Sequence, residues 1–145
     1  ACINGVELQV SPAPKACLSS GFGKRGERQH RGIDYQSKPA GPVVAASNGK
    51  IVKAEYRKKD YGNWVVIDHG SGVYSSYAHL ANFGDGIVVG ASVRKGQTLG
   101  KMGSSGISTD AIHLHYEIRQ GDINNPKNWW GMKAINPFKL PVVCN

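Results

Sequence analysis

The apolar residues of this chain do not follow the 3.6-residue period of an amphipathic helix over any stretch of about 12 residues or more. Nineteen glycines and seven prolines instead fit short strands joined by tight turns. A length of 145 residues leaves room for one domain with a single core. The sequence therefore predicts a compact, mostly β single domain with few or no helices.

Several segments rich in β-branched and apolar residues predict strands. Residues 43–46 and 49–56 are expected to pair around the turn between them, and residues 91–102 to form a small hairpin. Residues 62–68 are nearly continuously apolar, which predicts a strand buried on both faces. The next turn contains His69, for which we expect only a hydrogen-bonding role in a glycine-rich connection.

The two ends of the chain look less regular. Residues 1–18 contain Pro12 and Pro14 and predict an irregular N-terminal arm. Residues 121–145 predict a C-terminal tail packed on the core. Within it, the pair Trp129-Trp130 could line a groove or pack against the core, and we favour packing.

The three cysteines are Cys2, Cys17 and Cys144, and no Cys-x-x-Cys motif is present. A thiolate zinc site or a redox motif is therefore disfavoured. A disulfide between two of them would indicate an oxidising, extracytoplasmic compartment. A bond from Cys2 to Cys144 would close nearly the whole chain and contribute about 4 to 5 kcal/mol in the chain-entropy model. The sequence leaves open which two pair.

The formal net charge of +8 points to an anionic partner, although a solvated basic face is an equal alternative. No recognition-helix pattern or aromatic-rich RNA-binding signature is present, which disfavours nucleic acid. An anionic cell-wall polymer also fits the sign of the charge. No apolar run approaches the roughly 20 residues of a membrane span.

His113 and His115 are separated by one residue within an apolar run that predicts a strand. Because side chains alternate faces along a strand, His113, His115 and Glu117 are expected on one face and residues 112, 114, 116 and 118 in the core. The two imidazoles then lie roughly 7 Å apart at Cβ. Such a pair can chelate one metal, or place one ring on a metal and the other beside a substrate. Two ordinary hydrogen-bonded histidines are an equal alternative, so the pair needs partners.

Further donors lie in two other segments. His30 and Asp34 are four residues apart and therefore on one side of an extended chain, where they form either a surface hydrogen bond or part of a metal site. His79 ends the predicted strand at residues 73–80. Three protein ligands with an open fourth position are typical of catalytic zinc. Nitrogen and oxygen donors without thiolate suit Zn(II), and Co(II) or Mn(II) could occupy the same site. Spacing alone does not select which three of the five bind.

Three motifs occur in a specific order, with Phe22-Gly23 ahead of them: His30-Arg31-Gly32-Ile33-Asp34, Tyr77-Ala78-His79-Leu80 and His113-Leu114-His115-Tyr116-Glu117. Over about residues 19–120 the chain resembles the lysostaphin/LytM family of zinc metalloendopeptidases. The resemblance implies a core at 19–120 built of antiparallel sheets, a lysostaphin-like β-sandwich or open barrel whose narrow groove holds one zinc ion. One departure is that the approach to the histidine pair, residues 108–112, is longer than in relatives and contributes an Asp, which bears on substrate preference.

The resemblance also implies how the site is divided. His30, Asp34 and His115 would bind Zn²⁺, His113 would act as general base, and His79 would donate a hydrogen bond to the oxyanion. No His-Glu-x-x-His motif is present, so a glutamate base is not expected. Glu117, on the same face by alternation, is expected to orient a ligand or to have a salt-bridge or capping role.

The implied function is hydrolysis of peptide cross-links in bacterial peptidoglycan, with D-alanyl to meso-diaminopimelate bonds preferred over glycine bridges. We expect a monomer in an extracytoplasmic compartment, periplasmic or secreted. The main alternative is a non-catalytic relative that binds peptidoglycan or activates an amidase. The presence of all five site residues argues against it.

Overall fold

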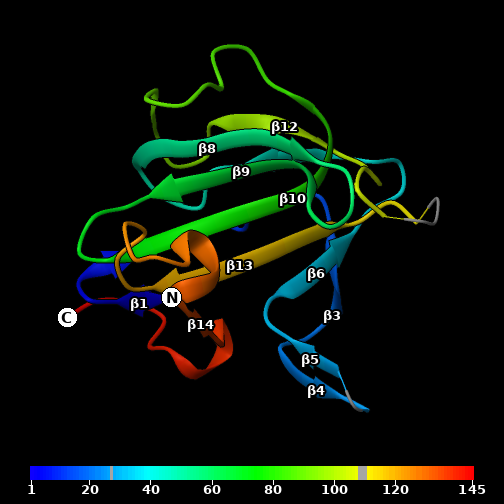
Figure 1. The fold of residues 1–145 in the computed structure, drawn as a ribbon. Helices are drawn as coiled ribbons and strands as arrows, with labels where there is room; N and C mark the ends of the chain where they lie inside the picture. Colours follow the sequence, from blue (N-terminus) through cyan, green and yellow to red (C-terminus); the bar gives the residue numbers. More distant parts are fainter. Residues whose placement is uncertain (27, 108–110) are drawn as a thin grey trace.

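The computed structural model describes residues 1–26, 28–107 and 111–145 (Figure 1). These residues form fourteen β-strands, two short 3-10 helices and no α-helix, which confirms the predicted mostly β fold. No helix in the described part of the chain is long and apolar enough to span a membrane.

The main sheet is antiparallel and contains the long central strands seen side by side in Figure 1. Its order is β11 (Ser92–Val93), β8 (Gly49–Arg57), β9 (Gly62–Asp68), β10 (Val73–Phe83), β13 (Leu114–Gln120), β6 (Ile33–Gln36) and β3 (Cys17–Ser20). Outside this path, β12 (Thr98–Met102) pairs with β10 and β7 (Pro42–Val44), and β14 (Lys133–Ile135) pairs with β13. The remaining elements are the hairpins β1 (Cys2–Ile3) with β2 (Val6–Glu7) and β4 (Gly23–Arg25) with β5 (Arg28–His30), and the 3-10 helices η1 (Asn128–Gly131) and η2 (Pro137–Lys139).

Strand β9 is buried on both faces, as its apolar sequence predicts. Val65 and Ile67 belong to the larger core, whereas Trp64 and Val66 belong to a second cluster on the opposite face. Trp129 of η1 completes this second cluster and is fully buried. The C-terminal tail therefore covers one face of the sheet. The packing predicted for the pair Trp129-Trp130 is confirmed for Trp129 and wrong for Trp130, which is 46% exposed.

Two predicted hairpins are wrong. Strand β7 pairs with β12 and not with β8, and β11 and β12 do not pair with each other. The amides of Val44 and Ala45 instead bond to the carbonyls of Pro12 and Gln97. Because these distant segments satisfy the backbone of the β7 region, its nearest neighbour in sequence is not its partner.

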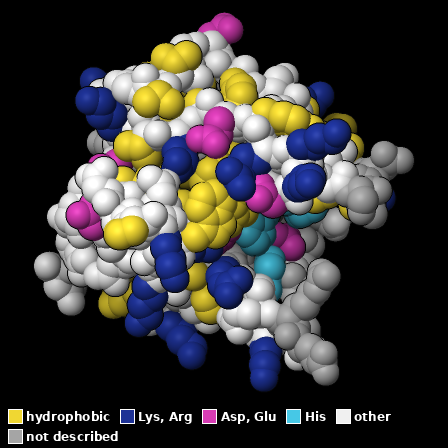
Figure 2. Space-filling view, in the orientation of Figure 1, with side chains coloured by type: hydrophobic (Ala, Val, Ile, Leu, Met, Phe, Trp, Pro, Cys, Tyr) yellow, Lys and Arg dark blue, Asp and Glu magenta, His cyan; other side chains and the backbone are white. Residues whose placement is uncertain are grey.

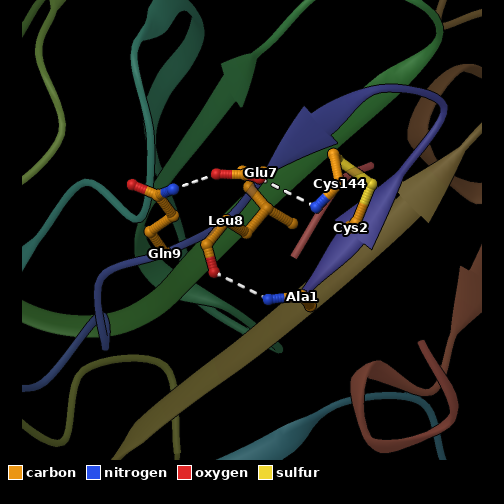
Figure 3. The surroundings of a disulfide bond; sticks show 6 residues. All are labelled: Ala1, Cys2, Glu7, Leu8, Gln9 and Cys144. Carbon is orange, nitrogen blue, oxygen red and sulfur yellow. Dashed lines mark hydrogen bonds between the residues drawn. A yellow bond between two sulfur atoms is a disulfide. The ribbon is translucent and has the colours of Figure 1, made fainter. Parts of the chain in front are cut away.

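The N-terminal segment is more ordered than the irregular arm expected from its prolines. It contains the β1–β2 hairpin, and Ile3 and Leu8 are buried in the core. Burial of these apolar side chains ties the segment to the domain. Cys2 forms a disulfide with Cys144, and the ammonium of Ala1 donates to the carbonyl of Leu8 at 3.1 Å (Figure 3). The third cysteine, at position 17, is exposed and has a free thiol.

Candidate metal centre

Pairing between β6 and β13 brings two segments that are far apart in sequence into one site. Asp34 lies directly opposite His115 in the ladder. The chain leading into β6 crosses close over β13 at Gly32, where a Cβ atom would collide with the carbonyl oxygen of Tyr116 and lie 2.7 Å from Cγ of Glu117. A glycine is therefore required there, and it lets the end of β5 reach the same site.

Three side chains meet at this crossing. One donor atom from each of His30, Asp34 and His115 lies within 4.8 Å of the others. Nε2 of His30 is 3.3 Å from Oδ1 of Asp34 and 3.3 Å from Nδ1 of His115. Nδ1 of His115 is 2.9 Å from Oδ1 of Asp34. Ligands bound tetrahedrally at zinc distances lie about 3.3 to 3.4 Å apart, so this donor set fits a zinc ion closely.

The outer nitrogen of each imidazole is fixed by a hydrogen bond. Nδ1–H of His30 donates to the carbonyl of Gly21 at 2.6 Å. Nε2–H of His115 donates to Oε2 of Glu117 at 3.0 Å. In the neutral tautomers that these bonds favour, the lone pairs of His30 Nε2 and His115 Nδ1 turn toward Asp34. This is the arrangement of a carboxylate- or carbonyl-oriented metal ligand.

Glu117 is buried and its carboxylate bonds to three side chains. Oε2 accepts from His115 and from the hydroxyl of Tyr61 at 2.7 Å, and Oε1 accepts from Nε and Nη2 of Arg119 at 3.0 and 2.9 Å. Nη1 of Arg119 donates to the carbonyls of Trp129 and Met132. The tail of the chain therefore holds the carboxylate that orients His115, a connection that no sequence pattern indicated.

The charge balance of the cluster favours a cation. Burial alone would lower the pKa of His115, but its hydrogen bonds to Asp34 and Glu117 raise it to about 9. Burial alone would raise the pKa of Asp34 and of Glu117, but the bond to His115 lowers both. A positive charge is thus stabilised between the two carboxylates, and a divalent ion satisfies the same demand.

His79 and His113 lie beside the cluster. Their ring centroids are 4.8 Å apart, and the ring of His79 is 6.1 Å from that of His115. The predicted strand end at His79 is in fact a bulge, after which β10 continues to Phe83. His79 has a positive φ of 67°, and Nδ1–H donates to the carbonyl of Ser105 at 2.8 Å. Burial lowers the pKa of His79 to about 4, so at neutral pH Nε2 carries a lone pair.

The histidine pair partly follows the predicted strand. His113 precedes β13 and pairs with Gly103 through an isolated bridge outside the ladder. Ile112 is 43% exposed although it was expected in the core. The ladder begins one residue later, at Leu114, so alternation does not extend back to position 112. The approach to the histidine pair, residues 108–112, was expected to differ from that of relatives. Residues 108–110 of this approach lie outside the described residues.

An aromatic wall borders the site, and the part of it formed by Tyr61 and Trp64 was not predicted from the sequence. Tyr61 stacks on Trp64 with centroids 4.7 Å apart, and lies 6.1 Å from the ring of His115 and 6.4 Å from Trp130. Trp130 is 46% exposed, unlike the buried Trp129 beside it. Figure 2 shows histidine side chains at the surface next to a hydrophobic patch, with Lys and Arg side chains around both.

Comparison with known proteins agrees with this geometry. The model of peptidase family M23 matches residues 28–136. A DD-carboxypeptidase/endopeptidase, Mpg, of Neisseria meningitidis serogroup B is 40% identical over 126 residues, which cover 82% of this chain and 28% of that protein. The glycyl-glycine endopeptidase ALE-1 of Staphylococcus capitis is 37% identical over 97 residues, which cover 66% of this chain and 26% of that protein. The chain thus spans only about a quarter of the length of these relatives.

The fold is similar to that of solved peptidases. The antimicrobial peptidase lysostaphin from Staphylococcus simulans superimposes with a TM-score of 0.70 at 30% identity, covering 86% of this chain and 48% of that chain. The lysostaphin-like fold expected from the sequence motifs is therefore confirmed.

Proposed function

Because the chain belongs to peptidase family M23, we propose that it is a zinc-dependent endopeptidase that hydrolyses peptide cross-links of bacterial peptidoglycan. The observation that carries this proposal is the convergence of His30, Asp34 and His115 within 4.8 Å, with two more imidazoles beside them. Three protein ligands are typical of catalytic zinc, whereas structural zinc is usually closed by four.

The proposed roles are those that the family resemblance implies, and the geometry supports them. His30, Asp34 and His115 would hold the ion, which when bound supplies Lewis-acid chemistry that brings the pKa of a water molecule to about 7. His113 would accept a proton as general base. The bond to Ser105 uses Nδ1–H of His79, and burial keeps the ring neutral. His79 would therefore donate to the oxyanion only after Nε2 takes up the proton that His113 accepts, their ring centroids being 4.8 Å apart, and developing negative charge favours this uptake.

The proposed scissile bond joins D-alanine to meso-diaminopimelate. The endopeptidase from Neisseria, named for DD activity, matches more of this chain and at higher identity than the glycyl-glycine enzyme does. Hydrolysis of glycine bridges is the alternative within the same family. A non-catalytic peptidoglycan-binding role is a further alternative, which the retention of all five site residues disfavours.

The proposed site of action is extracytoplasmic. The Cys2–Cys144 disulfide supports this because disulfides persist mainly in oxidising compartments. Peptidoglycan, as an anionic polymer, also suits a chain of net charge +8.

Digestion of purified peptidoglycan with and without a chelator tests the proposal. We expect soluble fragments only without chelator, restored when zinc is added back, and mass spectrometry of the newly exposed amine should identify diaminopimelate. Equal amounts of fragments with and without chelator would contradict the requirement for a metal ion. New amines on glycine would show that glycine bridges, and not D-alanyl to diaminopimelate bonds, are cleaved. Binding to peptidoglycan without any fragment would indicate the non-catalytic role.

A further inference from the structure

A cavity of about 220 Å³ near the metal cluster is lined by two arginines. Its walls are Arg31, Arg119, Trp130, Met132 and Ala134. The volume is several times the roughly 30 Å³ of a water molecule, so it accommodates a carboxylate together with the carbons attached to it.

Three observations place this cavity next to the site of chemistry. Arg31 directly follows the ligand His30, and the glycine after it packs against β13. Arg119 lies two residues beyond Glu117 and bonds to it. Trp130 is linked to the ring of His115 through Tyr61, which is stacked between them at centroid distances of 6.4 and 6.1 Å.

The positive charges of the cavity are not equally balanced. The charge of Arg119 is met by Glu117, and its hydrogen bonds to described residues use four of the five N–H groups of a guanidinium, leaving one Nη2–H. Nearby Arg57, which lies 4.5 Å over the ring of Trp130, is paired with Asp60 at 2.8 and 3.1 Å. Arg31 is exposed, and no carboxylate among the described residues forms an ion pair with it. The cavity therefore has an excess positive charge at Arg31.

We propose that this cavity binds the carboxylate on the carbon that carries the scissile nitrogen, and that Arg31 makes the enzyme specific for it. The inference rests on the proposed peptidase function and names the substrate group that the site selects. In a D-alanyl to diaminopimelate cross-link, the amide nitrogen is attached to a carbon that also bears a carboxylate, whereas the interior of a glycine bridge has no charge. The exposed ring of Trp130 lies where the methylene chain of diaminopimelate would pack.

Two matched substrates test this assignment. Both are synthetic stem-peptide dimers joined by a D-alanyl to diaminopimelate bond, one with the carboxylate next to the scissile nitrogen free and the other with it converted to a carboxamide. We expect the zinc-loaded protein to cleave the free acid with a kcat/KM about 10- to 100-fold higher, as for loss of a charged hydrogen bond. In Arg31→Gln, kcat/KM on the free acid should fall by this factor, whereas kcat/KM on the carboxamide should change little.

Two further variants sharpen the result. Arg31→Lys should restore part of the preference, because a lysine keeps the charge but not the forked geometry. Arg94→Gln is the matched control, since Arg94 is also an exposed arginine but lies in the turn between β11 and β12, and it should leave both rates unchanged.

The outcomes that overturn the inference differ from failure of the proposed function. Equal rates of the wild-type protein on the two substrates would overturn the inference and leave the peptidase function standing, as would an equal fall of both rates in Arg31→Gln. If neither substrate is cleaved, the peptidase function fails. Titration calorimetry with diaminopimelate and its monoamide then tests, independently of cleavage, whether the cavity binds the carboxylate. Equal binding of the two compounds would overturn the inference, whereas preference for the acid that Arg31→Gln removes would support it.

Discussion

Glu117 connects the metal cluster to the surrounding structure, because it bonds both to the proposed ligand His115 and to Arg119. Its buried carboxylate bonds to His115, Tyr61 and Arg119 at once. Glu117→Gln keeps the size of the side chain but removes the charge that orients His115 and balances Arg119. We expect zinc affinity to fall about 10- to 100-fold. We also expect the free energy of unfolding of the zinc-free protein to fall by about 3 to 5 kcal/mol, because a buried arginine loses its partner.

Chelator competition and denaturant unfolding measure these two effects. Glu55→Gln is the control, because Glu55 is exposed and its nearest ammonium, on Lys53, is 3.8 Å away. That variant should change the unfolding free energy by about 1 kcal/mol or less. An unchanged zinc affinity in Glu117→Gln would contradict the orienting role.

The two histidines of the β13 motif should fail in different ways when they are replaced. His115→Ala removes a proposed metal ligand, so we expect loss of both bound zinc and activity. His113→Ala removes only the proposed base, so we expect zinc to stay bound while kcat falls by about 100-fold or more. Metal analysis of the purified variants, with kinetics on the same samples, tests this split. Equal loss of zinc in both variants would contradict it.

At the level of elements, a polar network joins the turn after β9 to strand β10. Nδ1–H of His69 donates to the carbonyl of Asn48 at 2.6 Å, and Nε2 lies 2.7 Å from the hydroxyl of Ser75. The Ser75 hydroxyl is 2.6 Å from the hydroxyl of Tyr77, which accepts a hydrogen bond from the backbone amide of Ala46. A neutral His69 satisfies every bond, with each hydroxyl donating toward the imidazole. The hydrogen-bonding role predicted for this residue is therefore confirmed.

This network predicts a loss of stability in mild acid. Burial lowers the pKa of His69 below 6.5 despite the opposing effect of its bond to Asn48. As the pH falls below about 6.5, the unfolded imidazole takes up a proton and the folded one does not, so the free energy of unfolding decreases. The contribution of His69 to stability is fully present above pH 6.5. It is lost progressively as the pH falls, down to the lower pKa at which the folded ring also takes up a proton.

Denaturant unfolding of wild-type and His69→Gln proteins between pH 5 and 8 tests this account. We expect the wild-type free energy to fall more steeply on the acid side, because glutamine does not titrate. His79, whose pKa burial also lowers, is present in both proteins and cancels in the difference. Parallel curves would contradict the account.

The sequence predicted strands better than it predicted their partners. The apolar run of β9 and the alternation around His115 depend on residues within the strand, so they can be read locally. The partner of β7 depends on backbone bonds to segments around Pro12 and Gln97, which no local pattern encodes. The bulge at His79 likewise arises where β10 changes its register against β9.

At the scale of the whole molecule, the Cys2–Cys144 disulfide joins residues 142 positions apart. A cross-link closing so long a loop restricts the unfolded chain strongly, so we expect Cys2→Ala/Cys144→Ala to lower the free energy of unfolding by about 2 to 5 kcal/mol. Denaturant unfolding in oxidising buffer measures the effect. Cys17→Ser is the control and should cause no loss, because the thiol of Cys17 is exposed and free. An unchanged midpoint in the double variant would contradict the expectation.

The candidate site was predictable from sequence to the extent that its residues carry rare chemistry. The motifs containing His30, His79 and His113 are weak singly but specific in their order, so the family resemblance they carry named five candidate site residues. Arg31 could not be named, because an arginine has many ordinary roles. Trp130 was considered for lining a groove, but only the fold brings it to one cavity with Arg31.

The pairing of β6 with β13 unites parts of the chain that are more than 80 residues apart. The connection between β10 and β11 carries exposed side chains at Val88 and Val89 and none of the five site residues. A cut in this connection would leave His30 and Asp34 on one fragment and His115 on the other. Neither fragment would have a complete ligand set, so tight zinc uptake by a mixture of the two would report that they have reassembled.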